Sequence, residues 1–315
     1  MRVTITGGAG FIGANLVRTL EWRGWDVTVL DDLSNSEPDT VAGTSARLVR
    51  GCVTDPRALE DALAGADAVV HLAACTSVRR AAAAPEDCHR RNVTGSVRLL
   101  QAARDRDLHL VFASSAAVYG DATTLPISET APPAPIGPYG ESKLAMEEAV
   151  LRHGQEYALR TLVLRLFNVL GPYQHPDHSD SVVPRFVRAA LAGQPMTVFG
   201  DGTQTRDFVP VSMVCAVIDQ ALEHGSTAPA PVNVASGTAT SVLQIARTIA
   251  AVCRSGEAVE HRTGPPGEVR HSCGDPRGLR KLFPTLHAGS VADELERTVR
   301  WHELSAAATA PPVAR

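Results

Sequence analysis

Short apolar runs alternate with longer helix-period segments through the first half of the chain. We predict the runs to be strands, because they are apolar, short and bounded by turn residues; they cover residues 2–6, 27–30, 47–50, 68–72, 108–113 and 159–167. Helix-period patterns fall between them, over residues 14–20, 56–63, 86–106 and 139–154. This alternation predicts an α/β fold with a doubly wound parallel sheet.

The pattern changes after Gly171, where the elements become shorter. The loops at residues 200–202 and 264–267 are rich in glycine, aspartate and proline. We therefore expect a sheet domain over residues 1–171 and a smaller α/β lobe over residues 172–304, part of which returns to the first domain. Residues 305–315 are rich in alanine and proline, which predicts a flexible tail.

The composition narrows the range of functions. The 315 residues can bury a full core, and a net charge of −4 offers no basic surface for nucleic acid. The six cysteines show no CxxC pair or metal-ligand spacing, so we expect no metal site and a reducing compartment. The chain shows no leader and no run of about 18 apolar residues, which predicts a soluble cytoplasmic protein without a membrane span.

A glycine-rich turn, residues 7–13, joins the first strand to the first helix. Gly7 permits a tight turn, Gly10 lets the backbone approach a pyrophosphate, and Gly13 lets the helix lie close to the strand. The order of strand, glycine turn and helix is typical of a Rossmann dinucleotide site; the alternative is a turn without a ligand.

Asp31 and Asp32 end the second strand, about 20 residues beyond the glycines. A carboxylate at this place binds a ribose 2′-hydroxyl and repels a 2′-phosphate, so Asp31 favours NAD over NADP. The alternative is a loop carboxylate that caps the next turn. Ala73 and Ser115 follow other strands, so all these candidates meet at one edge of the sheet.

Tyr139 and Lys143 are four residues apart at the start of a predicted helix and therefore share one helix face. A nearby ammonium favours the charged form of a phenol, so we expect Lys143 to lower the pKa of Tyr139 and make it a base for a sugar hydroxyl. The alternative is an ordinary solvated pair at a helix start.

Taken together, these residues resemble the extended short-chain dehydrogenase/reductase family, and within it the NAD-dependent nucleotide-sugar epimerases and dehydratases of the UDP-glucose 4-epimerase type. The resemblance runs from Thr6 to about Asp275. It is carried by the segments 6–13, 31–35, 71–74, 114–120, 139–143, 165–168 and 200–211.

The resemblance implies a catalytic triad of Ser115, Tyr139 and Lys143, in which Tyr139 is the base, Lys143 lowers its pKa and holds the nicotinamide ribose, and Ser115 bonds the sugar O4. It also implies a cofactor site and a substrate site. The NAD contacts would be Gly7, Gly10, Phe11, Ile12, Gly13, Asp31, Asp32, Leu33, Ser34, Asn35, Cys52, Val53, Leu72, Ala73, Ala74, Thr76, Asn92, Ala113, Ser114, Tyr139, Lys143 and Phe167. The nucleotide-sugar contacts would be Thr76, Ser115, Tyr139, Asn168, Val182, Val183, Thr197, Phe199, Arg206, Arg270 and Ser272.

Arg206 is also attractive on its own chemistry, because a guanidinium fits a diphosphate in a bidentate manner; the alternative is a structural pair with Asp207. Two positions depart from the family pattern. Gly51-Cys52-Val53 lacks the aspartate that reaches the adenine, and Pro265 stands where the family often has an arginine, which leaves Arg270 as the nearest replacement.

The residues after Ser115 separate the chemistries of the family. Related dehydratases carry an acid and a base there to move water, whereas Ala116 and Ala117 transfer no proton. An epimerase needs only the tyrosine and NAD, so we predict a UDP-hexose or UDP-N-acetylhexosamine 4-epimerase. The alternatives are a 4-ketoreductase or dehydrogenase, a dehydratase with other acid and base residues, and a non-catalytic NAD-sensing or scaffold protein.

Two further expectations follow from the resemblance. In the family, the position that falls on Ser272 gates the C2 substituent, and its small side chain predicts tolerance of N-acetyl groups; the alternative is a plain loop residue. The helices over residues 86–106 and 139–154 match those that form a four-helix dimer interface, so we expect a homodimer.

Overall fold

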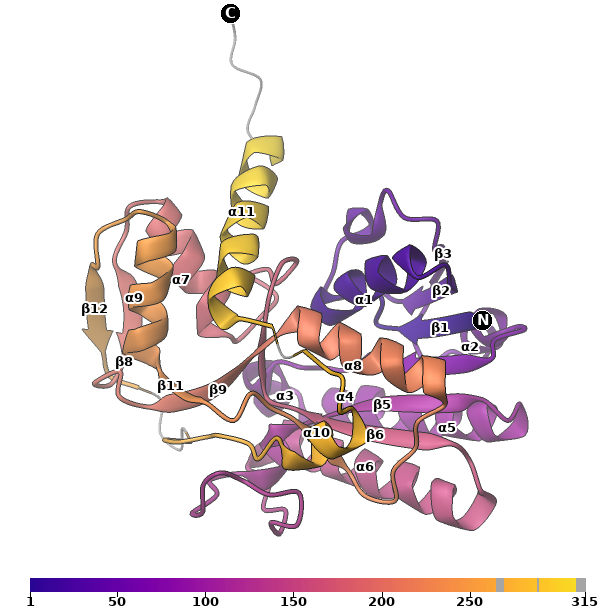
Figure 1. Ribbon diagram of the computed structural model, residues 1–315. Helices are drawn as coiled ribbons and strands as arrows, with labels where there is room; N and C mark the ends of the chain where they lie inside the picture. The colour runs from indigo at the N-terminus through magenta and orange to yellow at the C-terminus, as the bar shows by residue number, and fades with distance from the viewer. Residues whose placement is uncertain (265–268, 288, 310–315) are drawn as a thin grey trace, which may run out of the picture.

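A seven-stranded parallel sheet forms the centre of the chain, in a computed structural model that describes residues 1–264, 269–287 and 289–309 (Figure 1). The strand order is β10-β6-β5-β4-β1-β2-β3, so the chain winds outward from β1 in both directions. The predicted doubly wound sheet is therefore confirmed. The strands are β1 (Arg2–Thr6), β2 (Asp26–Asp31), β3 (Arg47–Arg50), β4 (Ala68–His71), β5 (His109–Ser115), β6 (Thr161–Leu166) and β10 (Val232–Val234).

Helices cover both faces of this sheet, which explains why β4 and β6 read as unbroken apolar runs and are buried along their whole length. On one face, α1 and α8 pack against the strands through Leu16, Val17 and Ile218. On the other face, α2, α5 and α6 bury Leu63, Leu100 and others. These helices are α1 (Phe11–Trp22), α2 (Pro56–Leu63), α5 (Gly95–Asp105), α6 (Gly137–Tyr157) and α8 (Val211–His224).

A smaller lobe with its own core lies beside the sheet. Its core residues include Leu170, Phe186 and Ile249. Figure 1 shows α11 rising beside α7 and α9, on the side where the lobe meets the sheet domain. The lobe elements are β7 (Asn168–Leu170), α7 (Val182–Leu191), β8 (Met196–Phe199), β9 (Thr205–Pro210), β11 (Ala239–Ser241), α9 (Val242–Val252), β12 (Val259–Arg262) and α11 (Val291–Thr309).

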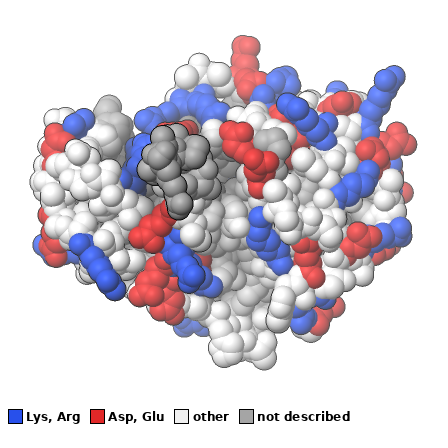
Figure 2. All heavy atoms as spheres, turned by 90° about the horizontal axis from the view of Figure 1, so that it is seen from above, with Lys and Arg blue, Asp and Glu red and all other residues white. Residues whose placement is uncertain are grey.

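Short elements fill the connections. They are η1 (Pro38–Val41), α3 (Val78–Ala83), α4 (Pro85–His89), η2 (Arg90–Thr94), η3 (Ala116–Tyr119) and α10 (Arg277–Leu282). On the face of the molecule seen in Figure 2, acidic and basic side chains are interspersed. The described residues of that face form no continuous patch of one sign.

One sequence-based helix prediction was wrong. The single helix predicted over residues 86–106 is divided into α4, the π-helical turn η2 and α5. The turn contains Asn92, whose amide is held by neighbouring elements: its Oδ1 accepts from Cys75 N at 2.7 Å, and its Nδ2 donates to Ser142 Oγ at 3.0 Å. Residues 305–309 of the expected tail continue α11 as a helix, and residues 310–315 lie outside the described part of the chain.

A buried ion pair fastens α6 to the sheet. Arg165 on β6 donates through Nε and Nη2 to the carboxylate of Glu147 on α6, and the two side chains are only 4% and 2% exposed. Ser114 Oγ on β5 donates to the same carboxylate at 2.8 Å, and Arg165 Nη1 donates to Tyr119 Oη at 2.7 Å. The pair therefore joins α6 to β5, β6 and η3 at one point.

We predict that Arg165→Met lowers the free energy of unfolding by about 3–5 kcal/mol, because it leaves the Glu147 carboxylate buried without its charge partner. Urea unfolding would measure this loss. The double variant Arg165→Met with Glu147→Leu removes both charges and should recover much of the loss. A double variant no more stable than the single one would show that the pair is not what stabilises this contact.

Candidate functional site

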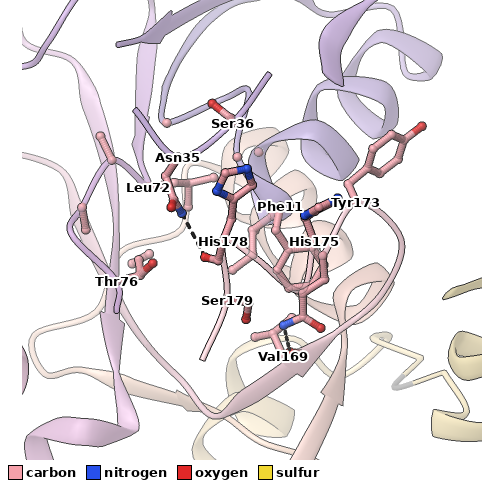
Figure 3. Close-up of a pocket in the computed structure, with 18 of the residues that line it drawn as sticks. Phe11, Asn35, Ser36, Leu72, Thr76, Val169, Tyr173, His175, His178 and Ser179 are labelled. Carbon is pink, nitrogen blue, oxygen red and sulfur yellow. Dashed lines mark hydrogen bonds between the residues drawn. The ribbon is translucent and has the colours of Figure 1, made fainter. Parts of the chain in front are cut away.

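A cavity of about 1070 Å³ runs along the carboxyl ends of the central strands. It is lined by the glycine turn, the ends of β2, β4 and β5, the start of α6 and the segment that follows β7 (Figure 3). Its volume lies at the upper end of the range for ligand cavities, which suits a ligand as large as a dinucleotide together with a second molecule.

The glycine turn at one end of the cavity has no room for side chains. Gly7 has a φ of +71°, and a Cβ there would lie 2.7 Å from Ala73 N. A Cβ at Gly13 would lie 2.3 Å from Gly7 O. Gly10 caps α1 without any side-chain hydrogen bond, so the first amides of the helix stay available for an anion in the cavity. These features fit the pyrophosphate of a dinucleotide.

Asp31 lies at the end of β2 beside this turn and is buried. Its carboxylate accepts hydrogen bonds from Ala9 N at 3.0 Å and Leu33 N at 2.9 Å. Burial raises the pKa of Asp31, while these bonds and one from Ser36 act against the rise. The carboxylate is thus fixed at the place where a ribose of the dinucleotide is expected.

Asp32 differs from Asp31 because it has a cationic partner. Burial would raise the pKa of Asp32, but hydrogen bonds from Ser34 and the Arg91 guanidinium outweigh this effect and the pKa is lowered. Arg91 Nη1 donates to Asp32 Oδ2 at 2.7 Å. Arg91 also lines the cavity, although the sequence offered no signal for it.

Ser115, Tyr139 and Lys143 meet at the other end of the cavity. Ser115 is the last residue of β5, and its Oγ accepts from Ala117 N at 3.1 Å. Tyr139 and Lys143 lie in the first two turns of α6, which begins at Gly137 with Pro138 in its first turn. Lys143 Nζ donates to the Ala113 carbonyl on β5 at 2.8 Å.

Burial is the largest influence on the pKa values of Tyr139 and Lys143. Desolvation by the surrounding protein raises the pKa of Tyr139, and the hydrogen bond with the Ser115 side chain lowers it in part. Burial lowers the pKa of Lys143 to about 8. In this structure the Lys143 ammonium is directed at the Ala113 carbonyl and burial dominates the pKa of Tyr139, so the lowering of that pKa by Lys143 stays a prediction. Ser115 is the group that favours the phenolate.

Most residues expected at the site line this one cavity. They are Gly7, Gly10, Phe11, Ile12, Gly13, Asp31, Asp32, Ser34, Asn35, Cys52, Val53, Leu72, Ala73, Ala74, Thr76, Ala113, Ser114, Ser115, Tyr139, Lys143, Phe167, Asn168, Val182 and Arg206. Asp207, the partner considered for Arg206, instead accepts from the backbone amides of Ser236, Gly237 and Gly274.

Seven expected residues do not line the cavity: Leu33, Asn92, Val183, Thr197, Phe199, Arg270 and Ser272. Asn92 is buried and is bonded to Cys75 and Ser142, and Val183 is buried in the core of the small lobe. Thr197 and Phe199 lie on β8, whose parallel partner β12 is at the far side of that lobe.

Two of these departures concern the substrate directly. Arg270 Nη2 donates to Asp201 Oδ2 at 3.1 Å, so the candidate replacement for the missing arginine is engaged with the lobe itself. Ser272 N donates to Thr205 O at 3.1 Å, which ties the expected gate to β9. Pro265 lies outside the described residues.

Several lining residues were not expected. Seven of them belong to the segment after β7, where Tyr173, Gln174, His175, His178, Ser179, Asp180 and Ser181 reach the cavity, and two more, Trp301 and Ser305, come from α11. The segment has no hydrophobic period, so its histidines were the only sign of chemistry in it. Nothing local in α11 indicates that it returns to the site.

Comparison with known proteins agrees with the dinucleotide ligand expected for this cavity. Residues 3–235 match the model of the NAD dependent epimerase/dehydratase family. A dTDP-glucose 4,6-dehydratase of Streptomyces niveus is 34% identical over 316 residues, which cover 96% of this chain and 93% of that protein.

Two solved structures are similar over nearly their whole length. The UDP-glucose 4-epimerase of Thermotoga maritima, solved with UDP-glucose, superposes with a TM-score of 0.92 at 29% identity, covering 97% of this chain and 100% of that one. The UDP-glucose 4-epimerase of Thermus thermophilus, solved with NAD, gives a TM-score of 0.88 at 31% identity, covering 96% of this chain and 99% of that one.

The position of Asp31 predicts the cofactor content. Purified protein should release NAD(H) on denaturation and no NADP(H), as separated by chromatography. Asp31→Asn removes the charge that repels a 2′-phosphate, so its preference for NAD over NADP should fall by about tenfold or more. Asp26→Asn, at the exposed start of the same strand, is the matched control. An unchanged preference in Asp31→Asn would remove this carboxylate from the ribose site.

Proposed function

The chain belongs to the NAD-dependent epimerase/dehydratase family, and we propose that it is a nucleotide-sugar 4-epimerase acting on a UDP-hexose or a UDP-N-acetylhexosamine. Its cofactor is NAD, whose expected site has a built cradle at Gly7, Gly10 and Gly13 and a fixed carboxylate at Asp31.

The observation that carries the proposal is the make-up of the reacting end of the cavity, where alanines take the place of a second acid and base beside the Ser115–Tyr139 pair. Ala116 and Ala117 follow Ser115 in η3, and alanine transfers no proton. Among the described residues, the carboxylates that line the cavity are Asp31, Asp32, Glu37, Asp39 and Asp180. The first four lie at the end of β2 or in the segment after it, at the dinucleotide end, which leaves Asp180 to be considered.

Asp180 is already engaged. Its carboxylate accepts from Ser77 Oγ at 2.8 Å and from Arg79 Nε at 2.8 Å. Burial would raise the pKa of Asp180, but these bonds outweigh it and the pKa is lowered, so the group stays ionised and is a poor acid. Removal of water from a sugar requires an acid as well as a base, and these residues support a reaction without that step.

An epimerisation at C4 uses the groups that are present. Tyr139 accepts the proton of the sugar 4-hydroxyl, and Ser115, bonded to Tyr139, holds the reacting oxygen and favours the phenolate. Bound NAD would supply the acceptor for the hydride of C4. The same cofactor would return the hydride to C4 after the 4-keto sugar has turned its other face toward it. The reaction has no net redox change, so the cofactor need not leave.

Arg206 supports a nucleotide diphosphate as the carrier of the sugar. It lines the cavity from β9, and a guanidinium binds a diphosphate in a bidentate manner. UDP is proposed because of the similar epimerase solved with UDP-glucose. Since Ser272 is tied to β9, the tolerance of an N-acetyl group stays a prediction that the substrate panel below tests.

A dehydratase is the second candidate, because one relative that is 34% identical over almost the whole chain is a dTDP-glucose 4,6-dehydratase.

No helix in the described part of the chain is long and apolar enough to span a membrane. The cytoplasmic location and the homodimer through α4, α5 and α6 stay predictions.

The experiment that tests the function is incubation of the purified protein with UDP-, dTDP-, CDP- and GDP-hexoses and with UDP-N-acetylhexosamines, with products identified by NMR. We expect the C4 epimer of one UDP-sugar pair, formed without added cofactor. A 4-keto-6-deoxy product would identify a dehydratase, and dependence on added NAD(P)H with a reduced product would identify a ketoreductase.

Tyr139→Phe keeps the aromatic ring and removes the proton acceptor. General base catalysis is worth about 10²–10⁴ in rate, so turnover should fall by at least that order while NAD stays bound. Turnover is measured with the sugar identified above, and NAD content by denaturation. Near-normal turnover would show that Tyr139 is not the base.

The hydrogen bond from Ser115 predicts a shift of the pH profile. The base acts in its ionised form, so kcat/KM should rise as pH rises through the pKa of Tyr139. Since Ser115 lowers that pKa, Ser115→Ala should move the rising limb to higher pH, whereas Ser115→Thr keeps a hydroxyl and should move it less. If the rising limb of kcat/KM lies at the same pH in the wild type and in Ser115→Ala, then Ser115 does not affect the ionisation of Tyr139.

A further inference from the structure

A strap, residues 172–181, crosses the mouth of the cavity between two helices of the sheet domain. At its first end, the Pro172 carbonyl accepts from Asn15 Nδ2 at 2.9 Å, and the same amide donates to Phe11 O at 2.9 Å. Tyr173 lies under the Arg18 guanidinium, 4.4 Å from ring centre to carbon. The strap therefore starts against the first turns of α1, beside the glycine turn.

The strap is fastened again on the opposite side of the cavity. The His178 carbonyl accepts from Asn35 Nδ2 at 3.1 Å. Asp180 binds Ser77 and Arg79 at the start of α3. The backbone of the strap thus passes from α1 across to the loop after β2 and on to α3, over the dinucleotide end of the cavity.

Two imidazoles lie between these points of attachment. The rings of His175 and His178 are 5.3 Å apart and both line the cavity. Figure 3 shows both rings extending from the strap on the side of Phe11 and the Asn35–Ser36 loop. They therefore face the first turn of α1, where the free amides favour a diphosphate.

Three arginines near this place already have partners. Arg91 pairs with Asp32 and Asp87, and Arg80 Nη2 donates to Asn35 Oδ1. Arg79 pairs with Asp180. By contrast, the ring of His178 contacts that of His175 and makes no hydrogen bond to any described residue. The half-buried imidazole of His178 is thus available as a donor for an anion.

We propose that His178, with His175 beside it, binds the diphosphate of NAD from the side opposite α1, and that the strap thereby holds the cofactor in the cavity. A protonated imidazole adds a charge-assisted hydrogen bond to the helix amides. The inference rests on the NAD cofactor of the family and not on which sugar reaction the protein catalyses.

The charges around the two rings set the pH dependence. Asp177 on the strap, Arg188 on α7, Glu37 after β2 and His302 on α11 all act on His175 or lie against it. Burial lowers the pKa of His175, with Asp177 and Glu37 acting in the opposite sense. Binding of a diphosphate favours the charged form of His175, so NAD should be held more tightly at low pH and less tightly as pH rises through the pKa of His175.

The test is the rate at which the purified holoprotein releases NAD, measured by filtration over days if necessary. His178→Gln removes the imidazole and should release NAD about threefold to tenfold faster than wild type. His178→Lys keeps a cationic donor at this place and should release NAD slowly. His224→Gln, on α8 and exposed, is the matched control.

Two results would overturn the inference. One is release of NAD from His178→Gln at the control rate. The other is an acceleration that His178→Lys shares, because this would show a structural role for the ring in the strap. Neither result bears on the 4-epimerase proposal, since NAD release is measured without a sugar.

Discussion

The buried pair of Glu147 and Arg165 is the interaction on which the geometry of the site depends. It joins the middle of α6 to β6, and through Ser114 to the end of β5. Ser114 precedes Ser115, and Glu147 lies one turn beyond Lys143 on the same helix face. The Glu147–Arg165 pair is buried from water, and it positions the strand end and the helix that carry the three groups proposed for catalysis.

Burial also determines how these groups ionise. The cavity desolvates both Tyr139 and Lys143, which raises the pKa of Tyr139 and lowers the pKa of Lys143. In each case the neutral form is favoured. A tyrosine whose neutral form is favoured needs a hydrogen-bond donor that stabilises its phenolate. The Ser115 side chain at the end of β5 is this donor. Among the described lining residues, carboxylates are confined to the dinucleotide end and to Asp180, so the reacting end is suited to a proton relay with one base.

The sequence predicted those parts of the site that local pattern determines. The glycine turn, Asp31 and Ser115 stand at strand ends, and Tyr139 and Lys143 share a helix face, so spacing alone brings them to one edge of the sheet. The strap was not predictable, because long-range contacts with α1 and α3 place it, and no period records such contacts. Trp301 and Ser305 were not predictable either, because they reach the cavity from the distant helix α11. The same limit explains Thr197, Phe199 and Ser272, whose strands and loops are oriented by the packing of the small lobe.

The central claim is that the reaction moves a hydride at C4 and removes no water. The most direct measurement is turnover in D₂O, with the product examined by mass spectrometry and NMR. The account predicts a product with the mass of the substrate and no deuterium bound to carbon, since only the hydroxyl proton passes through Tyr139. A product lighter by one water, with deuterium on a ring or methyl carbon, would contradict it, because elimination exchanges a carbon-bound proton with the solvent.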